Sequence, residues 1–409
     1  MKHALLWVCL LAWSAVGGAQ WRFQAPIDLT AADAQPHFHH LDGAGRRHVA
    51  AAGGAVAVAW EDDHSGQPQV YLAVMPAAAG HFGLRYQLSE GEEAYEPAVV
   101  TAGPAVWLAA WEQDGSILAR LVDEQGMGPV TTLAKGARQV TLAAADAGRL
   151  AVAWAKSSPQ GQQVQVARLQ RDGRQVGLAS EAIAVAPVER PFQGYPSIAW
   201  TSNGDLVIAW EDRRAGHTRL FHRVQDAKGG FTAERQLNEH NAPPPGEIAE
   251  AGLGSGVMRV ALAATDTDVR AIWLDKRNPG SGYAVWGAVS RDGGRRFGTN
   301  AIVQDEQGSA VAQWHASLAA GDGLYVAAWD DAREGWGDDS EPGDVILSWY
   351  EDGAWSPDLV VPVASGEGYQ GSPAVALDES GTLHLVWIAR ADLQGPTRLY
   401  YARARREAE

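Results

Sequence analysis

One pattern of apolar and polar positions recurs along the chain, a short alternating segment that closes on tryptophan. Apolar residues at every second position indicate strands, because successive side chains of a strand point to opposite faces. No segment combines a helical period with capping residues. The seven copies are AVAVAW ending at Trp60, VWLAAW at Trp111, RLAVAW at Trp154, LVIAW at Trp210, VRAIW at Trp273, LYVAAW at Trp329 and LHLVW at Trp387.

Each tryptophan segment belongs to a longer unit. Successive tryptophans lie 51, 43, 56, 63, 56 and 58 residues apart. A strand precedes the tryptophan segment, and a polar loop, a third alternating strand, a tight turn and a short last strand follow it. Units of four antiparallel strands at this spacing are typical of propeller blades. The sequence therefore predicts an all-β fold, a seven-bladed β-propeller of four-stranded antiparallel blades.

The two ends of the chain are predicted to close this ring. The last unit contains three strands (SPAVAL, LHLVW and RLYYARA), and the chain then ends in the residues RREAE. Residues 22–30 (RFQAPIDLT) have the same shape as residues 231–239 (FTAERQLNE), the outer strand of another unit. We expect the N-terminal strand to complete the C-terminal blade, which removes an exposed strand edge. The recurrent tryptophans are interpreted as core residues between neighbouring sheets.

The N-terminus has a composition of its own. Residues 4–16 are largely apolar and are followed by Gly17, Gly18 and Ala19, which predicts a signal peptide over residues 1–19. The apolar stretch is shorter than the roughly 20 residues that a membrane-spanning helix needs. We therefore expect a single propeller domain over residues 20–409, secreted or periplasmic, with no membrane span.

Cysteine content and charge limit the chemistry. Cys9 is the only cysteine, so removal of the leader leaves no disulfide, thiol nucleophile or cysteine metal site. The net charge is −16 and the pI about 5.2, which argues against a nucleic-acid partner, because binding to phosphates needs a basic surface. We expect a monomer without a cofactor.

A turn motif lies between the third and fourth strands of the fifth unit. It reads SRDGGRRF, from Ser290 through Asp292 to Phe297, and degenerate copies occupy the same place around Asp172, Asp226 and Asp352. The motif resembles the Asp box, or BNR repeat, of the sialidase superfamily. The resemblance implies a turn in which the aspartate binds backbone amides and the aromatic residue anchors the loop. In that family the turn lies opposite the active face, which implies a scaffold role.

A second motif, W-x-D-x-R, starts at three of the tryptophans and ends at Arg214, Arg277 and Arg333, with Asp62 and His64 forming a partial copy. It resembles a pattern of exported sialidase-like repeat proteins. One interpretation is a ring of acids and arginines around the channel. The other is an aspartate that organises its loop and pairs with the arginine two residues on. Recurrence in several blades favours the second interpretation, because a catalytic centre needs asymmetry.

The resemblance also shows what this chain lacks. Sialidases hold the substrate carboxylate with three arginines and use a tyrosine, a glutamate and an aspartate in catalysis. One of those arginines belongs to an Arg-Ile-Pro motif near the N-terminus, where this chain reads APIDL over residues 25–29. Sialidase catalytic domains also have six blades rather than seven. We therefore predict a member of the superfamily that is not a sialidase.

Candidate ligand residues lie in loops that the repeat does not explain. The loops after the second strand and before the first strand are the long, irregular ones, and they share one face of the ring. In the sixth unit two tryptophans outside the repeat lie beside charged residues. They resemble a platform for stacking sugars, and the alternative is that they anchor loops. The candidates are Trp314, His315, Asp330, Asp331, Arg333 and Trp336 in that unit, with Glu96, Tyr195, Arg277 and Tyr369 in others.

Two further segments stand out. His37, His39 and His40, near Asp42, have a composition that can hold a transition metal ion. Because adjacent residues of an extended chain point in opposite directions, His39 and His40 favour a solvated loop over a metal site. The loop over residues 238–256, rich in proline and glutamate, is a candidate cover for the channel mouth.

Three functions are compatible with these features. The preferred hypothesis is an exported, non-catalytic propeller that binds a glycan or a protein on its loop-rich face. The second is a divergent, sialidase-like glycoside hydrolase. The third is an assembly or scaffold factor, a role that seven-bladed Asp-box propellers also serve.

Overall fold

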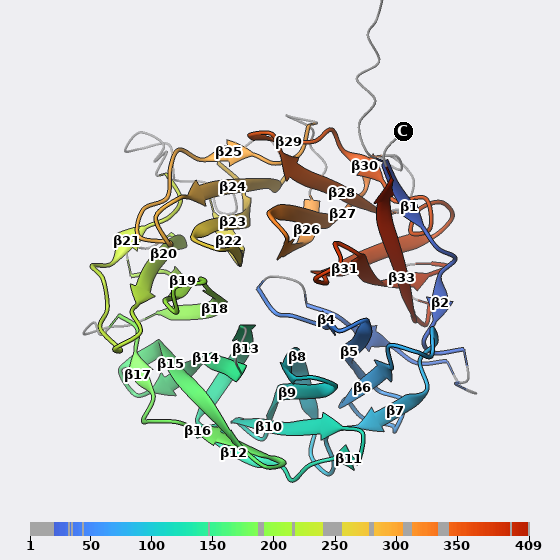
Figure 1. The fold of residues 1–409 in the computed structure, drawn as a ribbon, viewed down its shortest axis with the longest axis horizontal. Coiled ribbons are helices and arrows are strands. Elements are labelled where there is room, and N and C mark those ends of the chain that lie inside the picture. The colour runs from blue at the N-terminus through green and yellow to red at the C-terminus, as the bar shows by residue number, and fades with distance from the viewer. Residues whose placement is uncertain are drawn as a thin grey trace, which may run out of the picture.

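The computed structural model describes residues 20–31, 33, 36–42, 45–145, 148–186, 192–214, 217–239, 256–277, 282–305, 313–333, 343–392 and 395–407. Over these residues the chain forms strands and no α-helix. Seven antiparallel sheets surround a central axis, so the predicted seven-bladed propeller is confirmed (Figure 1). The predicted leader and the loop over residues 240–255 lie outside the described residues.

The blades follow one another in chain order, and each runs from an inner to an outer strand. Blade 1 contains β3 (His39–His40), β4 (Val49–Ala52), β5 (Ala55–Asp62), β6 (Gln69–Met75) and β7 (Leu84–Gln87). Blade 2 contains β8 (Ala94–Gly103), β9 (Val106–Gln113), β10 (Ser116–Asp123), β11 (Gly126–Met127) and β12 (Thr131–Lys135). Blade 3 contains β13 (Ala137–Ala145), β14 (Arg149–Ser158), β15 (Gly161–Asp172), β16 (Gln175–Leu178) and β17 (Ile183–Ala184).

The remaining blades repeat this order. Blade 4 contains β18 (Gln193–Trp200), β19 (Leu206–Asp212), β20 (Arg219–Gln225) and β21 (Arg235–Gln236). Blade 5 contains β22 (Val257–Thr265), β23 (Asp268–Asp275), β24 (Ala284–Ser290) and β25 (Ala301–Ile302). Blade 6 contains β26 (Gln313–Gly321), β27 (Leu324–Asp331), β28 (Asp344–Glu351), β29 (Ala354–Trp355) and β30 (Leu359–Val360). Blade 7 contains β31 (Tyr369–Leu377), β32 (Leu383–Arg390) and β33 (Arg398–Glu407), with β1 (Gln20–Phe23) and β2 (Ile27–Asp28).

The N-terminal strand closes the ring, as predicted. β1 pairs antiparallel with β33, with Gln20 opposite Glu407, and β2 pairs with the start of the same strand. The third strand of blade 7 extends through Glu407, so the charged residues Arg405, Arg406 and Glu407 belong to the sheet. Between β2 and β3 the chain crosses the seam from blade 7 to blade 1.

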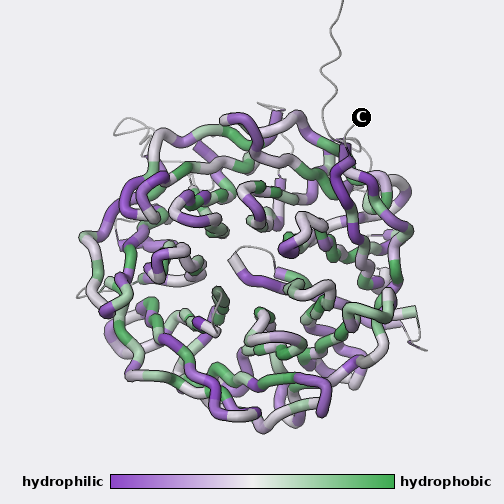
Figure 2. Tube along the Cα trace, in the orientation of Figure 1, coloured by the Kyte–Doolittle hydropathy of each residue, from purple (hydrophilic) through white to green (hydrophobic). Residues whose placement is uncertain are grey.

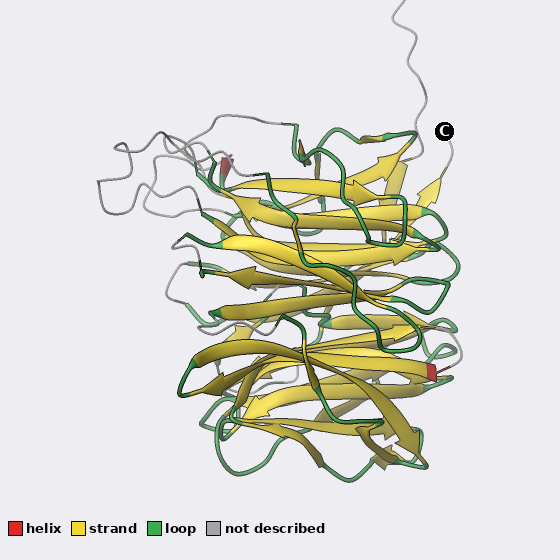
Figure 3. Ribbon diagram, turned by 90° about the vertical axis from the view of Figure 1, so that its left-hand side faces the viewer, coloured by secondary structure: helices red, strands yellow, loops and turns green. Residues whose placement is uncertain are grey.

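The core is divided among the blade interfaces. Seven clusters of buried apolar residues lie between neighbouring blades, and each cluster contains one repeat tryptophan. All seven tryptophans are fully buried, which confirms their predicted role in packing. Figure 2 shows apolar positions distributed around the whole ring, and Figure 3 shows the strands running between its two faces, where the loops lie.

The W-x-D-x-R motif forms a local aspartate–arginine pair in blades 4, 5 and 6. The indole N–H of Trp273 donates to Asp275 (3.0 Å), and Arg277 binds the same carboxylate (2.6 Å). Blades 4 and 6 contain the same aspartate–arginine pair, at 2.5 and 2.6 Å. In blade 1, Arg85 from the outer strand takes the place of the arginine. The predicted local pairing is therefore confirmed.

The Ser290–Phe297 turn is held by short-range hydrogen bonds. Asp292 accepts from the Ser290 hydroxyl (2.8 Å) and from the Arg296 amide (2.9 Å). The Gly293 amide donates to the Thr267 carbonyl (3.0 Å) in the turn between the first two strands of the blade. The motif therefore lies on the face opposite the long loops.

Candidate functional site at the channel mouth

Six blades share a break in the first strand, opposite the tryptophan of the second. In blade 2, for example, Tyr95 pairs with Glu112 and Ala98 with Ala110, so two residues face Trp111 alone. Such a bulge redirects one side chain away from the pleat. The first bulge residue has a positive φ, which is uncommon for residues other than glycine and gathers at functional sites. These residues are Glu96, Gln139, Tyr195, Arg259, His315 and Ser372.

The bulges are held by acids that directly follow the repeat tryptophan. The amide N–H of Arg259 donates to Glu211 of the preceding blade (2.8 Å), and that of Ser372 donates to Asp330 (3.3 Å). Glu61 and Glu112 accept from the bulge amides of the next blades in the same way. Four carboxylates are thus fixed around one end of the channel.

Blade 1 has a loop where the other blades have a bulge. His40 pairs with Glu61 and Val49 with Val58, so residues 41–48 replace the two bulge residues. Figure 1 shows the described part of this loop reaching the middle of the ring, and Figure 2 colours it as hydrophilic. The Gly45 carbonyl accepts from Thr141 of blade 3 (2.7 Å). We call residues 41–48 the plug loop.

Arg46 of the plug loop lies among the acids. It is 6% exposed and binds Asp42 (2.6 Å), Glu96 and the Val140 carbonyl (3.3 Å). Glu112 lies 3.9 Å from the same guanidinium. Burial opposes its charge, but Glu96 and Asp42 outweigh this effect and raise the pKa of Arg46.

Burial favours the neutral form of two acids of the mouth, Glu112 and Glu211. Burial, and a hydrogen bond that the protonated Glu112 carboxyl donates to Glu96, raise the pKa of Glu112 to about 8. Burial also raises the pKa of Glu211. Asp42 differs, because Arg46 and Arg259 overcome its burial and lower its pKa. At neutral pH Glu112 therefore carries a proton.

A second cluster surrounds Asp330 at the interface of blades 6 and 7. His315 Nδ1 lies 2.8 Å from one carboxylate oxygen, and the Tyr369 hydroxyl donates to the other (3.1 Å). Asp330 overcomes burial and raises the pKa of His315, while burial raises that of Tyr369. The ring of Tyr369 occupies the space that a Cβ on Gly371 would need.

Aromatic rings border these acids. Trp314 is 39% exposed, and its ring lies 5.1 Å from that of Tyr283 at an angle of 47°. The Arg259 guanidinium stacks on Tyr195 at 3.5 Å and reaches Asp42 at 3.9 Å. We call the whole site the channel mouth. It consists of Asp42, Arg46, Glu61, Glu96, Glu112, Tyr195, Glu211, Arg259, Tyr283, Trp314, His315, Asp330 and Tyr369.

The predicted ligand residues fall into three groups. Six of them meet at the channel mouth. Asp331, Arg333 and Arg277 instead belong to the aspartate–arginine pairs, with Arg333 also binding Asp358 (2.8 Å) and Arg277 stacking on Trp286. Trp336 lies outside the described residues. The six at the mouth are Glu96, Tyr195, Trp314, His315, Asp330 and Tyr369.

The three histidines of the predicted cluster lie at two different places. His40 faces the channel mouth beside Glu61 (3.6 Å), and a hydrogen bond to Glu61 raises its pKa. His37 and His39 are buried at the seam, at 7% and 5% exposure. The expectation of a solvated loop is therefore wrong for these two, because Thr397 of blade 7 binds and covers the segment. The opposite orientation of His39 and His40 is as expected.

Sequence reasoning missed much of the acidic site. Glu61, Glu112 and Glu211 each follow a repeat tryptophan, and this recurrence was a usable signal. Arg46 and Arg259 gave no such signal, because their roles depend on a loop insertion and a bulge that leave no periodic trace.

No known protein family and no curated protein matches this sequence. A protein of unknown function from Dyadobacter fermentans aligns over 95% of this chain and 99% of its own, at 12% identity and a TM-score of 0.53. An ulvan lyase from a new polysaccharide lyase family aligns over 89% of this chain and 94% of its own, at 8% identity and a TM-score of 0.57. Trypanosoma rangeli sialidase in complex with sialic acid aligns over 94% of this chain but 59% of its own, at 9% identity and a TM-score of 0.48. The first two matches, with TM-scores above 0.5, show that this chain shares its overall fold with known structures, here a seven-bladed β-propeller.

Proposed function

We propose that this protein is an exported, glycan-binding propeller whose ligand is a neutral oligosaccharide held at the channel mouth. The exposed Trp314, paired with Tyr283 beside a ring of carboxylates, carries the proposal. Aromatic faces stack on the C–H faces of sugars, and fixed carboxylates accept hydrogen bonds from sugar hydroxyls. The positive-φ bulges fix several of these acceptors in place before a ligand arrives.

The charge of the mouth selects against acidic sugars. Arg46 binds Asp42 and Glu96, and Arg259 lies between Asp42 and Glu211 at 3.9 and 3.8 Å. Both guanidinium groups are therefore neutralised by the protein itself. An incoming carboxylate would meet more acids than free cations, whereas a neutral sugar carries no such cost.

Binding is favoured over hydrolysis by the spacing of the acids. Glycosidases that retain or invert configuration need two carboxyl groups roughly 5–10 Å apart. Glu112, the acid whose pKa is raised to about 8, is hydrogen-bonded to Glu96. These two carboxyl groups are therefore closer together than glycoside hydrolysis requires.

One observation favours glycoside hydrolysis as a second candidate. A carboxyl group with a pKa of about 8 is protonated at neutral pH, as a general acid must be, and Glu112 has that property. In this case Asp330, placed by His315 and Tyr369, is the second carboxylate.

A glycan array followed by calorimetry tests the binding proposal. We expect neutral oligosaccharides to bind and their carboxylated analogues to bind at least about tenfold more weakly. Trp314→Ala is expected to lower affinity about 10- to 100-fold, since a stacked aromatic contact supplies about 1–3 kcal/mol. Met127→Ala is the matched control, because Met127 is similarly exposed (37%) but lies on the outer rim of blade 2.

Three outcomes would contradict the proposal. Equal binding by Trp314→Ala would remove its main support. Hydrolysis of chromogenic glycosides, abolished by Asp330→Asn or Glu112→Gln, would favour the enzyme. Absence of any glycan binding, with a partner protein that co-purifies with the wild type, would favour an assembly role.

Export is part of the proposal and rests on the leader over residues 1–19. Mass spectrometry of protein expressed with its own N-terminus tests it. A mature chain that begins near Gln20 is expected, and retention of Met1 in the exported fraction would contradict it.

A further inference from the structure

The seam between blades 7 and 1 brings together three side chains that suit a metal ion. One potential ligand atom each from Asp33, His37 and His39 lies within 4.8 Å of the others. His37 Nε2 lies 3.2 Å from Asp33 Oδ2, and the rings of His37 and His39 are 4.5 Å apart. Two ligands at about 2.1 Å from a tetrahedral ion lie roughly 3.4 Å from each other, so small rotations are enough to bring the three together around one ion.

The backbone explains why the two histidines converge. The His37 carbonyl accepts from the Thr397 amide (3.0 Å), and the His39 amide donates to the Thr397 hydroxyl oxygen (2.5 Å). Asp63 of blade 1 binds the intervening Phe38 amide (2.8 Å). These bonds hold the segment extended, and residues two apart in an extended segment point to the same side.

A ring nitrogen of His39 provides independent support for a bound metal ion. The Nδ1 of His39 lies 2.9 Å from the Thr397 hydroxyl, while its Nε2 is buried and has no hydrogen-bond partner. A buried polar nitrogen without a partner is costly and calls for an explanation. Metal-binding histidines typically donate from one ring nitrogen to a fixed acceptor and coordinate with the other.

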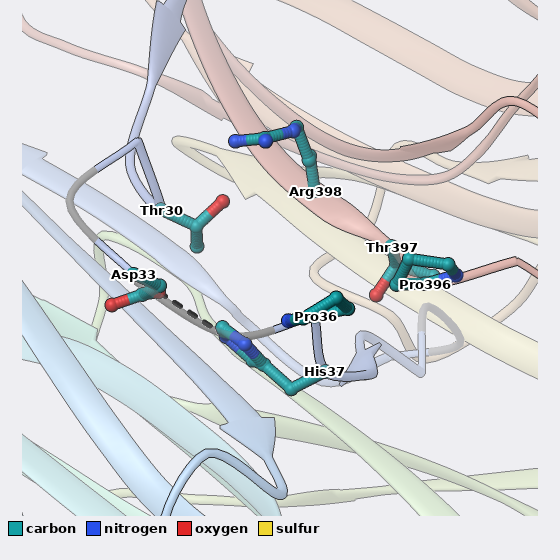
Figure 4. A pocket seen from close by; sticks show the side chains of 7 residues that line it. All are labelled: Thr30, Asp33, Pro36, His37, Pro396, Thr397 and Arg398. Carbon is teal, nitrogen blue, oxygen red and sulfur yellow. Dashed lines mark ion pairs between the residues drawn. The ribbon is translucent and has the colours of Figure 1, made fainter.

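We propose that Asp33, His37 and His39 bind a divalent transition metal ion, with Zn²⁺ as the preferred occupant. The ion would fasten the connection between β2 and β3 to blade 1. Two imidazoles and one carboxylate suit Zn²⁺ and its transition-metal neighbours, whereas Ca²⁺ and Mg²⁺ take oxygen ligands. A cavity of about 180 Å³ opens beside His37 and gives solvent a path to it. Figure 4 shows Asp33 and His37 next to each other on one side of the lining, joined by their ion pair, with Thr397 on the other side.

Arg85 is the competing cation at this site. It binds both oxygens of Asp33 (2.6 and 2.8 Å) and also reaches Asp62 (3.0 Å). The carboxylates of Asp33 and Asp62 together carry two negative charges, and Arg85 neutralises one of them. One negative charge therefore remains to attract the metal ion. The ion takes Oδ2, which faces His37, while Arg85 keeps Oδ1. His64, whose ring lies 5.0 Å from that of His37, or a water completes the coordination.

Zinc titration of the chelator-treated full chain tests this site. We expect one equivalent of Zn²⁺ in calorimetry and a rise in the melting temperature, because a ligand of the folded state alone stabilises it. Co²⁺ should give the absorption bands of a low-coordinate nitrogen and oxygen site. Mg²⁺ should change neither reading.

Variants locate the ion. His39→Ala and the more conservative His37→Gln are each expected to weaken Zn²⁺ binding at least about tenfold. His81→Ala is the matched control, since His81 lies on an exposed turn of blade 1 and binds only the Ala79 carbonyl in the described structure. Absence of Zn²⁺ binding by the folded wild type would overturn the proposal. Binding that is equal in wild type and His37→Gln would overturn it as well.

Discussion

Blade 1 and the other six blades differ in structure at the same position of the repeat. Opposite the repeat tryptophan, six blades carry a two-residue bulge, whereas blade 1 carries the eight residues of the plug loop. The bulges alone would leave a ring of acids around an open channel. The plug loop supplies Arg46, a buried cation that binds Asp42 of the loop itself and Glu96 of blade 2. A single irregular blade therefore gives a repeating scaffold one asymmetric site.

The two kinds of position also differ in how they are stabilised. Five of the six bulges are tied to the preceding blade by a contact from the backbone amide to a carboxylate or a side-chain amide, as between Tyr195 and Gln139 (2.9 Å). The plug loop instead contacts a blade that is not its neighbour. The Gly45 carbonyl accepts a hydrogen bond from Thr141 of blade 3, and Arg46 donates one to the Val140 carbonyl of the same blade. Changes in the plug loop should consequently affect the whole ring, and changes in one bulge should stay local.

Arg46→Ala is expected to have the largest effect. Removing a buried cation leaves Asp42, Glu96 and Glu112 without their common partner, a change that typically costs about 3–5 kcal/mol. Urea unfolding at neutral pH measures it. Arg295→Ala is the control, because Arg295 pairs with Asp205 at the surface (2.5 Å, 43% exposed), where a pair is worth about 1 kcal/mol or less. Equal losses in the two variants would show that the plug loop is not a special position.

The regular part of this comparison was predictable from sequence. The seven tryptophans, the alternation of the strands and the closing N-terminal segment are local patterns, and local patterns survive into the fold. The partial repeat at Asp62 and the pairing of Asp275 with Arg277 were also within reach, because the partners lie two residues apart.

Most of the irregular part could not be predicted from the sequence. A positive φ at Glu96 or Arg259 is produced by the register of two strands, and no residue type marks it there. The plug loop looked like the continuation of a histidine-rich, solvated segment. Only the ring geometry shows that Arg46 lies between blades 1, 2 and 3, and that His37 and His40 belong to different sites.

Gly45→Ala is expected to have the second largest effect. A Cβ at Gly45 would lie 2.6 Å from the Val260 carbonyl oxygen of blade 5 and 2.7 Å from Ser197 Cβ of blade 4. Overpacking costs about 1–3 kcal/mol, beyond the roughly 1 kcal/mol for alanine at a positive φ. Gly53→Ala measures the cost of the positive φ alone, because Gly53 also has a positive φ but a Cβ there would meet no atom within 4 Å. Thermal unfolding of both variants should therefore show the larger loss for Gly45→Ala, and the reverse order would mean that the loop does not fill the channel.

A smaller effect is expected from pH. The pKa of Glu112 is raised from 4.5 to about 8, so the folded state holds a proton that the unfolded chain releases. This contribution to stability is complete below about pH 4.5 and is lost as the pH rises through about 8. We expect Glu112→Gln to reduce the loss of stability between about pH 5 and about pH 8 by about 1–3 kcal/mol, measured by urea unfolding at each pH. An unchanged pH dependence would show that Glu112 ionises normally beside Arg46.

The smallest expected effect concerns the boundary between the plug loop and a regular bulge. Glu61 accepts from the Glu96 amide (3.1 Å) and also faces His40, which directly precedes the plug loop. Glu61→Gln keeps an acceptor for the amide but removes the charge that raises the pKa of His40. The pKa of His40, followed by NMR, should therefore fall, while stability changes by less than about 1 kcal/mol. His222, whose pKa burial lowers to about 4 in blade 4, serves as the reference resonance. A fall in stability as large as that of Arg46→Ala would instead mean that the bulge acids, and not the plug loop, hold the ring together.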